Sequence, residues 1–557
     1  MVSTSLSKKQ WAPTWGSLPP EIRLLILQCL IQDGCTLSRL ATVSREWQTE
    51  IERHNFARIR LTPSRLVNFN AMVQRNRALV SYIWFCLELD DYDCTTCAPT
   101  RQTLTEEEYE EAFAISDTDK CPITTGFRSL FSNLSTWDHH GDLTLDISIY
   151  SPSDSGHWFK YLTFVPDTPS NVPGDYGIEK ALSNGDYHDP QHGWVAGFRQ
   201  SGPSPSAIRK VFHSVMEQGP FHNDQSELQW WDQLPSVPVV TSLLLRQQNR
   251  RRWKPNSLAH MFARFPRLQE VHYEPWREWD FMQSDTDRSE YYYITPHPFN
   301  LLLVLFHVCT YLLIIGIIFL GYRYLFESIQ HSNISLKRLV VFENFNQQYP
   351  STMQRFLEGV DLNRCDRIRS PAPAVSQTVA LASLKLEHLA ASFIVDASHF
   401  FEIRPTWEWS NLKSLVLTSQ LLTPDENSTE IEAMLQAAAA AAMHMPRLEM
   451  MEIWNGRKGL AALFRYQALR NVQQAILLWR GTWDLAMEPS MVRAWEAVMR
   501  QYGGRRLDLV QERLEKAAIK SHGDALYYLM LSNQVIRPIS LQQIQAEQKA
   551  LDGVNTI

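Results

Sequence analysis

The sequence is poor in cysteine and has no excess of basic residues. The first absence narrows the compartment of the protein, and the second narrows its partners. Eight cysteines are scattered over 557 residues, and the N-terminal stretch MVSTSLSKKQWAPTWG lacks the apolar core of a secretory signal. We therefore expect a reducing compartment, the cytoplasm or the nucleus. The formal net charge is -7, with both signs interspersed. This pattern supplies no basic stripe for a phosphate backbone, so nucleic acid is not an expected partner.

Motifs for catalysis and cofactor binding are also absent. The chain has no Walker-type Gly-x-x-x-x-Gly-Lys-Ser/Thr loop, no Gly-x-Ser-x-Gly elbow, no His-Glu-x-x-His helix and no dinucleotide fingerprint. We therefore expect a protein that is not an enzyme and holds no cofactor. Cys94 and Cys97 have metal-ligand spacing, but zinc takes four ligands, and Cys121, His139 and His140 could join them only through the fold. A plain polar loop is the alternative.

The length and composition indicate a folded protein with more than one packing unit. Hydrophobic residues make up 44% of the chain and aromatic residues 11%, which is typical of globular proteins. A chain of 557 residues exceeds what one hydrophobic core normally supports. We expect one small unit and one large unit.

The small unit is predicted at the N-terminus, where two apolar helical runs follow each other. Ser17 can cap a helix whose first turn contains proline and Glu21, and apolar residues recur at helical spacing up to Leu30. The segment 32–34 interrupts this run, and a second run ends at Trp47. Such a helical hairpin is too short to be stable alone, so we expect it to lean on a partner or on the rest of the chain.

The residues LPPEIRLLILQCL and LSRLATVSREW in this hairpin resemble the F-box. The resemblance covers roughly 40 residues, from Leu18 to about Phe56, and departs from the usual pattern at Gly34-Cys35. It implies that the hairpin docks on the Skp-type adaptor of a cullin-RING ubiquitin ligase. The residues implied in the hairpin core or in adaptor binding are Leu18, Pro19, Ile22, Leu25, Ile26, Leu30, Leu37, Leu40, Val43 and Trp47. An ordinary hairpin that packs on its own chain is the alternative.

The large remainder shows a recurring pattern of short apolar strands preceded by helical stretches. The strands are predicted at 239–245, 265–273, 335–342, 383–389, 411–417, 445–454 and, more weakly, 472–479, with a further alternating strand at 143–150. The pattern predicts an α/β fold, an irregular solenoid similar to leucine-rich repeats, and the alternative is an irregular α/β domain. With the F-box, it resembles the F-box proteins with leucine-rich-like repeats of filamentous fungi.

These patterns divide the chain into segments. We expect a disordered lead at 1–14, the F-box at 15–62, a loop-rich α/β region at 63–230, repeat-like regions at 231–294 and 323–487, a hydrophobic segment at 295–322, and a C-terminal helical cap at 488–557. The function expected from this organisation is substrate recognition for a ubiquitin ligase, with an unknown protein as target. A membrane-anchored or soluble repeat scaffold outside any ligase is the alternative.

The hydrophobic segment interrupts the repeat pattern. Residues 301–322, LLLVLFHVCTYLLIIGIIFLGY, carry no formal charge and are long enough to cross a bilayer as a helix. A single crossing would place half of one repeat array on each side of a membrane. Removing about 27 residues would shorten the interval between Leu268 and Leu336 to about 41, close to the other intervals. Retained intron sequence, a single-pass membrane helix and a buried helix are the three interpretations.

Overall fold

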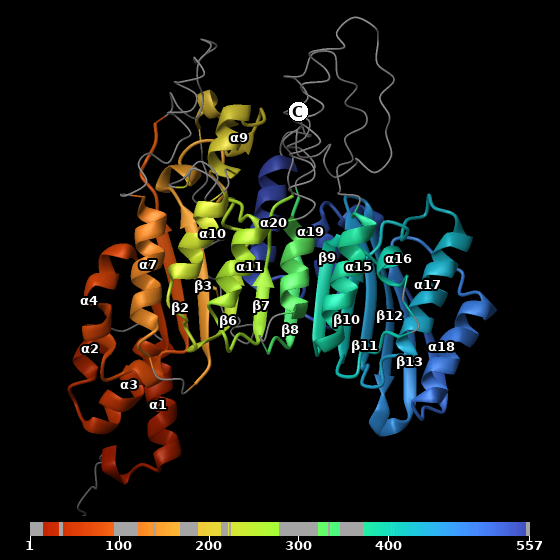
Figure 1. Ribbon diagram of the computed structural model, residues 1–557, viewed down its shortest axis with the longest axis horizontal. Coiled ribbons are helices and arrows are strands. Elements are labelled where there is room, and N and C mark those ends of the chain that lie inside the picture. Colours follow the sequence, from red (N-terminus) through yellow and green to blue (C-terminus); the bar gives the residue numbers. More distant parts are fainter. Residues whose placement is uncertain are drawn as a thin grey trace, which may run out of the picture.

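One large β-sheet organises the chain in the computed structural model (Figure 1). The structure describes residues 15–32, 37–93, 121–137, 141–167, 188–212, 215, 221, 224–277, 321–331, 335–345, 371–402, 404 and 406–552. The sheet has twelve strands, which are neighbours in the order in which they occur in the chain. They are β1 (Arg58–Leu61), β2 (Tyr82–Glu88), β3 (Leu143–Tyr150), β6 (Val240–Leu245), β7 (Glu270–Tyr273), β8 (Arg338–Phe342), β9 (His388–Asp396), β10 (Ser414–Thr418), β11 (Met450–Arg457), β12 (Leu460–Leu469), β13 (Gln474–Gly481) and β14 (Arg506–Arg513).

Most neighbouring strands are parallel. The exceptions are the antiparallel pairs that β12 forms with β11 and with β13. A parallel pair needs a crossover connection, which is usually a helix, and the chain supplies such helices between the strands. The predicted α/β class is confirmed, since the fold combines helices with a large, mostly parallel sheet.

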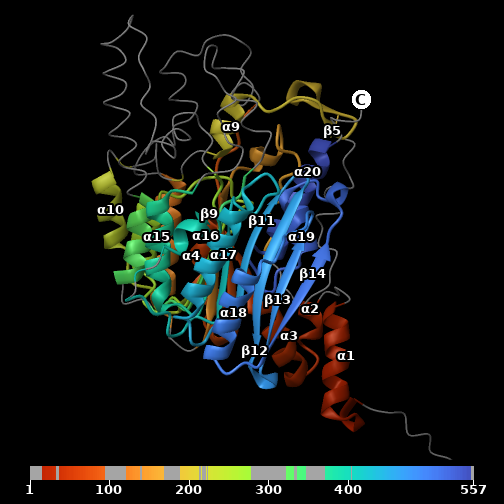
Figure 2. The same ribbon diagram turned by 90° about the vertical axis from the view of Figure 1, so that its right-hand side faces the viewer.

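The connecting helices cover one face of the sheet, as the two ribbon views show (Figures 1 and 2). They are α4 (Pro63–Val73), α7 (Pro122–Leu134), α10 (Asp224–Gln233), α11 (Pro255–Ala263), the helix at 321–331, α15 (Pro373–Ala382), α16 (Ala397–Phe400), α17 (Ser428–Ala442) and α18 (Pro489–Gln501). Alternate strand residues such as Ile83, Phe85 and Leu87 are fully buried in the core cluster that includes these helices. At Gly126 of α7 a Cβ would lie 2.4 Å from the end of the Leu87 side chain, so any larger residue there would force Leu87 to move.

The opposite face of the sheet is partly covered by the C-terminal part of the chain (Figure 2). Helices α19 (His522–Leu529) and α20 (Pro538–Asp552) carry apolar residues that pack in one cluster with residues of β8 to β12. Its members include Val340, Val416 and Trp454 from the strands and Leu529 from α19. The expected helical cap at 488–557 therefore contains strand β14 as well as helices, and α19 and α20 lie on the face of the sheet.

A smaller group of elements lies beside this face. It comprises a two-stranded sheet of β4 (Trp194–Val195) and β5 (Phe198–Arg199), and helix α9 (Pro205–Phe212). Its core contains aromatic side chains, among them Trp158, Tyr161 and Trp194. Phe164 packs against this core and also stacks on Tyr150 of β3, with ring centroids 4.0 Å apart. The segment up to residue 167 thus reaches the uncovered face of the sheet.

Most of the apolar run at 301–322 lies outside the described residues. Its last two residues, Gly321 and Tyr322, belong to the described helical residues 321–331. Tyr322, Leu325 and Phe326 of this helix are buried in the core cluster beneath the sheet. Within the described ranges, no helix has both the length and the apolar character that a membrane crossing requires.

Candidate functional site

The N-terminal helical unit, residues 15–57, projects from the β1 end of the sheet (Figure 1). It contains η1 (Trp15–Ser17), α1 (Pro20–Gln32), α2 (Leu37–Leu40) and α3 (Arg45–Ala57). The first strand of the sheet, β1, begins directly after α3 at Arg58. Among the described residues of the segment predicted as 15–62, the last helix ends at Ala57, and residues 58–61 form strand β1. Helix α1 begins at Pro20, so Pro19 rather than Ser17 occupies the N-cap position.

The unit is held together by a small set of contacts between α1, η1 and α3. The Trp15 and Trp47 rings lie 5.0 Å apart, and Trp15 Nε1 donates a hydrogen bond of 3.0 Å to Glu46. Glu46 also pairs with Arg23 of α1 at 2.8 Å. These contacts fix the side of α1 that faces α3.

The other side of α1 is apolar and exposed. Ile22, Leu24, Leu25 and Ile26 are between 36% and 54% exposed, whereas Leu27 is only 2% exposed. Burying each such aliphatic side chain in a partner would contribute about 1.5–3 kcal/mol, scaled by the fraction that is still exposed. A run of four partly exposed aliphatic residues on a projecting helix marks a surface for protein contact.

The predicted adaptor-binding residues divide between surface and interior. Pro19, Ile22, Leu25, Ile26 and Val43 are exposed, and Leu18, Leu30, Leu37, Leu40 and Trp47 are partly buried. Sequence reasoning did not single out Leu24, which shares the exposed surface, or Leu27, which is the buried anchor of α1. The two leucines lie in an unbroken apolar run, and nothing in that run distinguishes the inward side.

A second candidate site is a cleft of about 310 Å³ on the face of the sheet opposite the connecting helices. Its floor is formed where β2, β3, β6 and β7 begin, and one wall comes from Asp167 and Arg537. The lining residues are Arg58, Ser81, Tyr82, Asp142, Thr144, Asp167, Ser242, Leu244, Glu270, His272 and Arg537. Helices α19 and α20 pack on strands β8 to β12 of this face. The cleft therefore lies on the part of the face that these two helices leave open.

The strand register explains why these residues meet. Arg58 is paired with Tyr82, Tyr82 with Thr144, Thr144 with Ser242, and Ser242 with Glu270. Side chains alternate between the two faces of a strand, so one cross-strand row places all five residues on the same face. Five strands contribute residues to the cleft, and the first of them, β1, begins more than 200 positions before the last, β7.

A buried ion pair lies beside the floor, on the same face of the sheet. Asp146 and Arg246 are both fully buried and 2.6 Å apart, and the Tyr82 hydroxyl also donates a hydrogen bond to Asp146. Burial raises the pKa of Asp146, and the Arg246 guanidinium opposes that shift. Burial, together with the Asp146 charge, also raises the pKa of Tyr82 well above its usual value. Tyr82 therefore stays protonated and acts as a hydrogen-bond donor at neutral pH.

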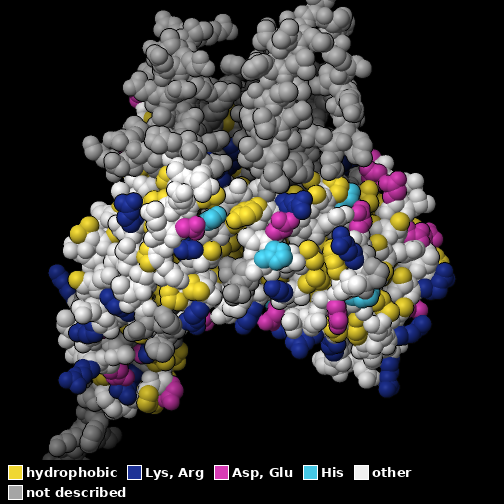
Figure 3. Space-filling view, viewed as in Figure 1, with side chains coloured by type: hydrophobic (Ala, Val, Ile, Leu, Met, Phe, Trp, Pro, Cys, Tyr) yellow, Lys and Arg dark blue, Asp and Glu magenta, His cyan; other side chains and the backbone are white. Residues whose placement is uncertain are grey.

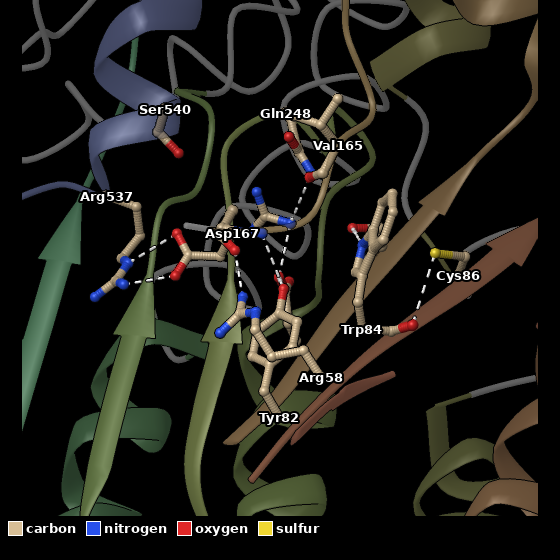
Figure 4. A network of polar contacts seen from close by, with 12 residues as sticks. Arg58, Tyr82, Trp84, Cys86, Val165, Asp167, Gln248, Arg537 and Ser540 are labelled. Carbon is tan, nitrogen blue, oxygen red and sulfur yellow. Dashed lines mark hydrogen bonds and ion pairs between the residues drawn. The ribbon is translucent and has the colours of Figure 1, made fainter. Parts of the chain in front are cut away.

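The wall of the cleft joins parts of the chain that are far apart in sequence (Figure 4). Arg537 Nε and Nη2 donate to the two Asp167 carboxylate oxygens, at 3.1 and 2.5 Å. The Asp167 backbone carbonyl accepts a hydrogen bond from Arg58, whose guanidinium stacks 3.7 Å above the Tyr82 ring centroid. This two-bond pair neutralises Arg537 and Asp167 within the wall.

Glu270 is neutralised in a similar way. His272 and Arg338 both contact its Oε1 atom, at 2.9 and 3.1 Å. Partial burial would raise the pKa of Glu270, but the hydrogen bond from His272 and the charges of His272 and Arg338 hold it below the usual value.

Two charged residues in the cleft have no ion-pair partner among the described residues. Arg58 is exposed and contacts the Asp167 carbonyl and the Tyr82 ring, but no carboxylate. Asp142 has neither a hydrogen bond nor an ion pair with that part of the chain. The charges of Arg58 and Asp142 are therefore not neutralised by an opposite charge within the described residues.

The predicted metal candidates do not form a site in the described residues. Cys94, Cys97, His139 and His140 lie outside the described residues, and Cys121 is buried in the hydrophobic core at the start of α7. No group of three potential metal ligands occurs among the residues that are described.

Part of the chain is similar to a known protein family. A protein-family description, "Family of unknown function (DUF6546)", matches residues 331–537. This range begins at the end of the helix at 321–331, includes strands β8 to β14 and ends at Arg537 in the wall of the cleft. No curated protein sequence matches the chain.

Proposed function

We propose that this protein is a substrate-recognition subunit of a Skp-cullin-F-box type ubiquitin ligase. The observation that carries the proposal is the exposed apolar surface of α1, formed by Ile22, Leu24, Leu25 and Ile26, on a helical unit that projects from the sheet. In this proposal the surface docks on the Skp-type adaptor. The resemblance of the segment from Leu18 to about Phe56 to the F-box supports the choice of partner.

The large sheet presents the target protein in this proposal. Strands that neighbour each other in chain order, with connecting helices on one face, support an irregular leucine-rich-repeat-like solenoid. In this proposal the chain is not an enzyme. It holds the target near a ubiquitin-conjugating enzyme and so raises the effective concentration of the target lysine. The cytoplasm or the nucleus is the proposed compartment.

The test is copurification of the full chain with its Skp-type adaptor. A variant with Ile22→Ser, Leu25→Ser and Ile26→Ser should weaken this interaction by at least about 30-fold, which corresponds to the loss of about 2 kcal/mol expected when one hot-spot residue of an interface is removed. These side chains are exposed, so the variant should keep the fold of the free protein.

The matched control is Val67→Ser. Val67 is 84% exposed on α4, outside the helical unit. The control should bind the adaptor like the unmodified chain. Adaptor binding by the triple variant at unchanged strength would contradict the proposal. A folded chain that never binds the adaptor would instead favour a scaffold outside any ligase.

A further inference from the structure

Arg58 and Asp142, the two charges of the cleft without an ion-pair partner among the described residues, indicate what kind of ligand the cleft binds. A single anion would be attracted by Arg58 but repelled by Asp142, and a single cation would meet the reverse situation. The other charged residues on the lining, Arg537, Asp167 and Glu270, already have opposite partners. The cleft therefore favours a ligand that carries both an acidic and a basic group.

The spacing of these charges suits an extended peptide. Arg58 lies on β1, two strands away from β3, and Asp142 precedes Thr144 of β3 by two residues. With strands about 4.8 Å apart and a rise of about 3.3 Å per residue, their Cα atoms are roughly 12 Å apart. Residues three or four positions apart in an extended chain span roughly the same distance.

The floor between the two charges can bind a peptide backbone. The Thr144 and Ser242 hydroxyls line the cleft, and neither side chain forms a hydrogen bond with the described residues. Hydroxyl groups can both donate and accept, so they match the N–H and C=O groups of a bound main chain. A floor with hydroxyls and charges also differs from the mostly apolar lining of small-molecule pockets.

We propose that this cleft binds an extended segment of the target protein, in which an acidic side chain contacts Arg58 and a basic side chain three or four residues away contacts Asp142. The identity of the ligand as a target protein rests on the proposed function. The cleft adjoins the helical unit, since Arg58 directly follows the last residue of α3. A bound segment is thus held at the junction between the sheet and the adaptor-binding unit.

The test is selection of random dodecapeptides displayed on phage, with the full chain immobilised and no adaptor present. The enriched peptides should pair an Asp or Glu with a Lys or Arg three or four positions away. Arg58→Glu should abolish the preference for the acidic position, and Asp142→Lys should abolish the preference for the basic position. Each should weaken binding of a selected synthetic peptide by about tenfold or more, as expected for charge-assisted contacts.

Charge reversal in the peptide supplies a second readout. Replacing the acidic residue of a selected peptide by lysine should restore binding to the Arg58→Glu variant. Asp142→Lys breaks no hydrogen bond or ion pair among the described residues, so it tests the cleft even if Arg58→Glu affects folding. The controls are Arg493→Glu on α18 and Asp425→Lys before α17, both exposed and outside the cleft.

Two results would overturn the inference. One is an absence of enriched peptides, and the other is enrichment that Arg58→Glu and Asp142→Lys leave unchanged. Neither result involves the adaptor, so they are separate from a failure of α1 to bind it. A chain that selects the expected peptides but never binds the adaptor would retain the cleft assignment and lose the ligase.

Discussion

His522 makes the packing of α19 on the sheet sensitive to acid. It is the first residue of α19, and its ring stacks on Phe345 with centroids 4.3 Å apart. Its Nε2 lies 2.8 Å from the Asn344 side-chain oxygen, so the neutral ring donates this hydrogen bond. Burial lowers the pKa of His522 from 6.5 to about 3. Glu547, which lines the same small cavity, is paired with Arg250 at 2.7 Å.

This depressed pKa has a definite consequence for stability. In the unfolded chain His522 takes up a proton below about pH 6.5, whereas in the folded chain it does so only near pH 3. The stability that the neutral ring contributes is therefore complete above pH 6.5 and falls by about 1.4 kcal/mol per pH unit below it. At pH 4.5, two units below the unfolded value, the loss is about 2.7 kcal/mol.

The assay compares the unmodified chain with His522→Gln, whose amide can still donate to Asn344. Protection of the α19 backbone amides from hydrogen exchange gives the free energy of opening at pH 7.5 and pH 4.5. We expect the unmodified chain to lose about 2.7 kcal/mol more than the variant between these pH values. Other titrating groups are common to both proteins and cancel in the difference. Equal losses would refute the assignment of a neutral, buried His522.

Two further predictions concern packing and charge. Leu27→Ala should destabilise the helical unit by about 2–5 kcal/mol because Leu27 is buried, whereas Leu25→Ala should change its stability by at most about 0.5 kcal/mol. Urea unfolding of the two variants measures this difference, and equal effects would contradict the orientation of α1. Arg537→Met leaves the buried Asp167 carboxylate unpaired and should cost about 3–5 kcal/mol, measured as faster limited proteolysis between α19 and α20. Unchanged cleavage would show that the pair does not hold this segment.

Much of the sheet could be predicted because its strands have clear local patterns. The alternating segment Leu143–Tyr150 is strand β3 with the predicted bounds, and the predicted strands at 239–245 and 411–417 overlap β6 and β10. The predicted strand at 383–389 meets β9 only at its end, since 383–385 forms a short 3-10 helix. Strand β9 also contains Phe393 with φ of 64°, near a shift of its register with β10. Such a bulge depends on the neighbouring strand and leaves no local signal.

Other elements could not be predicted because non-local pairing decides them. Strand β12, LAALFRYQAL, is rich in alanine and leucine, which favour helices, and its antiparallel pairing with β11 and β13 overrides that preference. Strand β14 is an edge strand with many charged residues, so its sequence resembles an exposed helix. The sequence predicted that α1 is a helix, but contacts with α3 decide which side of α1 is exposed.

The cleft escaped prediction for a related reason. Asp167 and Arg537, which form its wall, are separated by 370 positions. No periodicity or motif connects two such residues, and only the return of the C-terminal segment across the sheet brings them together. Its floor consists of single residues from several strands, each of which looks like an ordinary polar position in its own strand.

The C-terminal cover on the sheet also has a consequence for the synthesis of the chain. Arg250 is buried against Glu547, and 297 residues separate the two. At translation rates of about 5–20 residues per second, roughly 15–60 s pass before the partner of this arginine exists. Once synthesised, Val340, Phe393 and Trp454 also lack their contacts with α19 until residues 522–529 have been made. We therefore expect the nascent chain to need chaperones until its last helices are synthesised, and a chain that stops near residue 520 to keep these apolar side chains exposed.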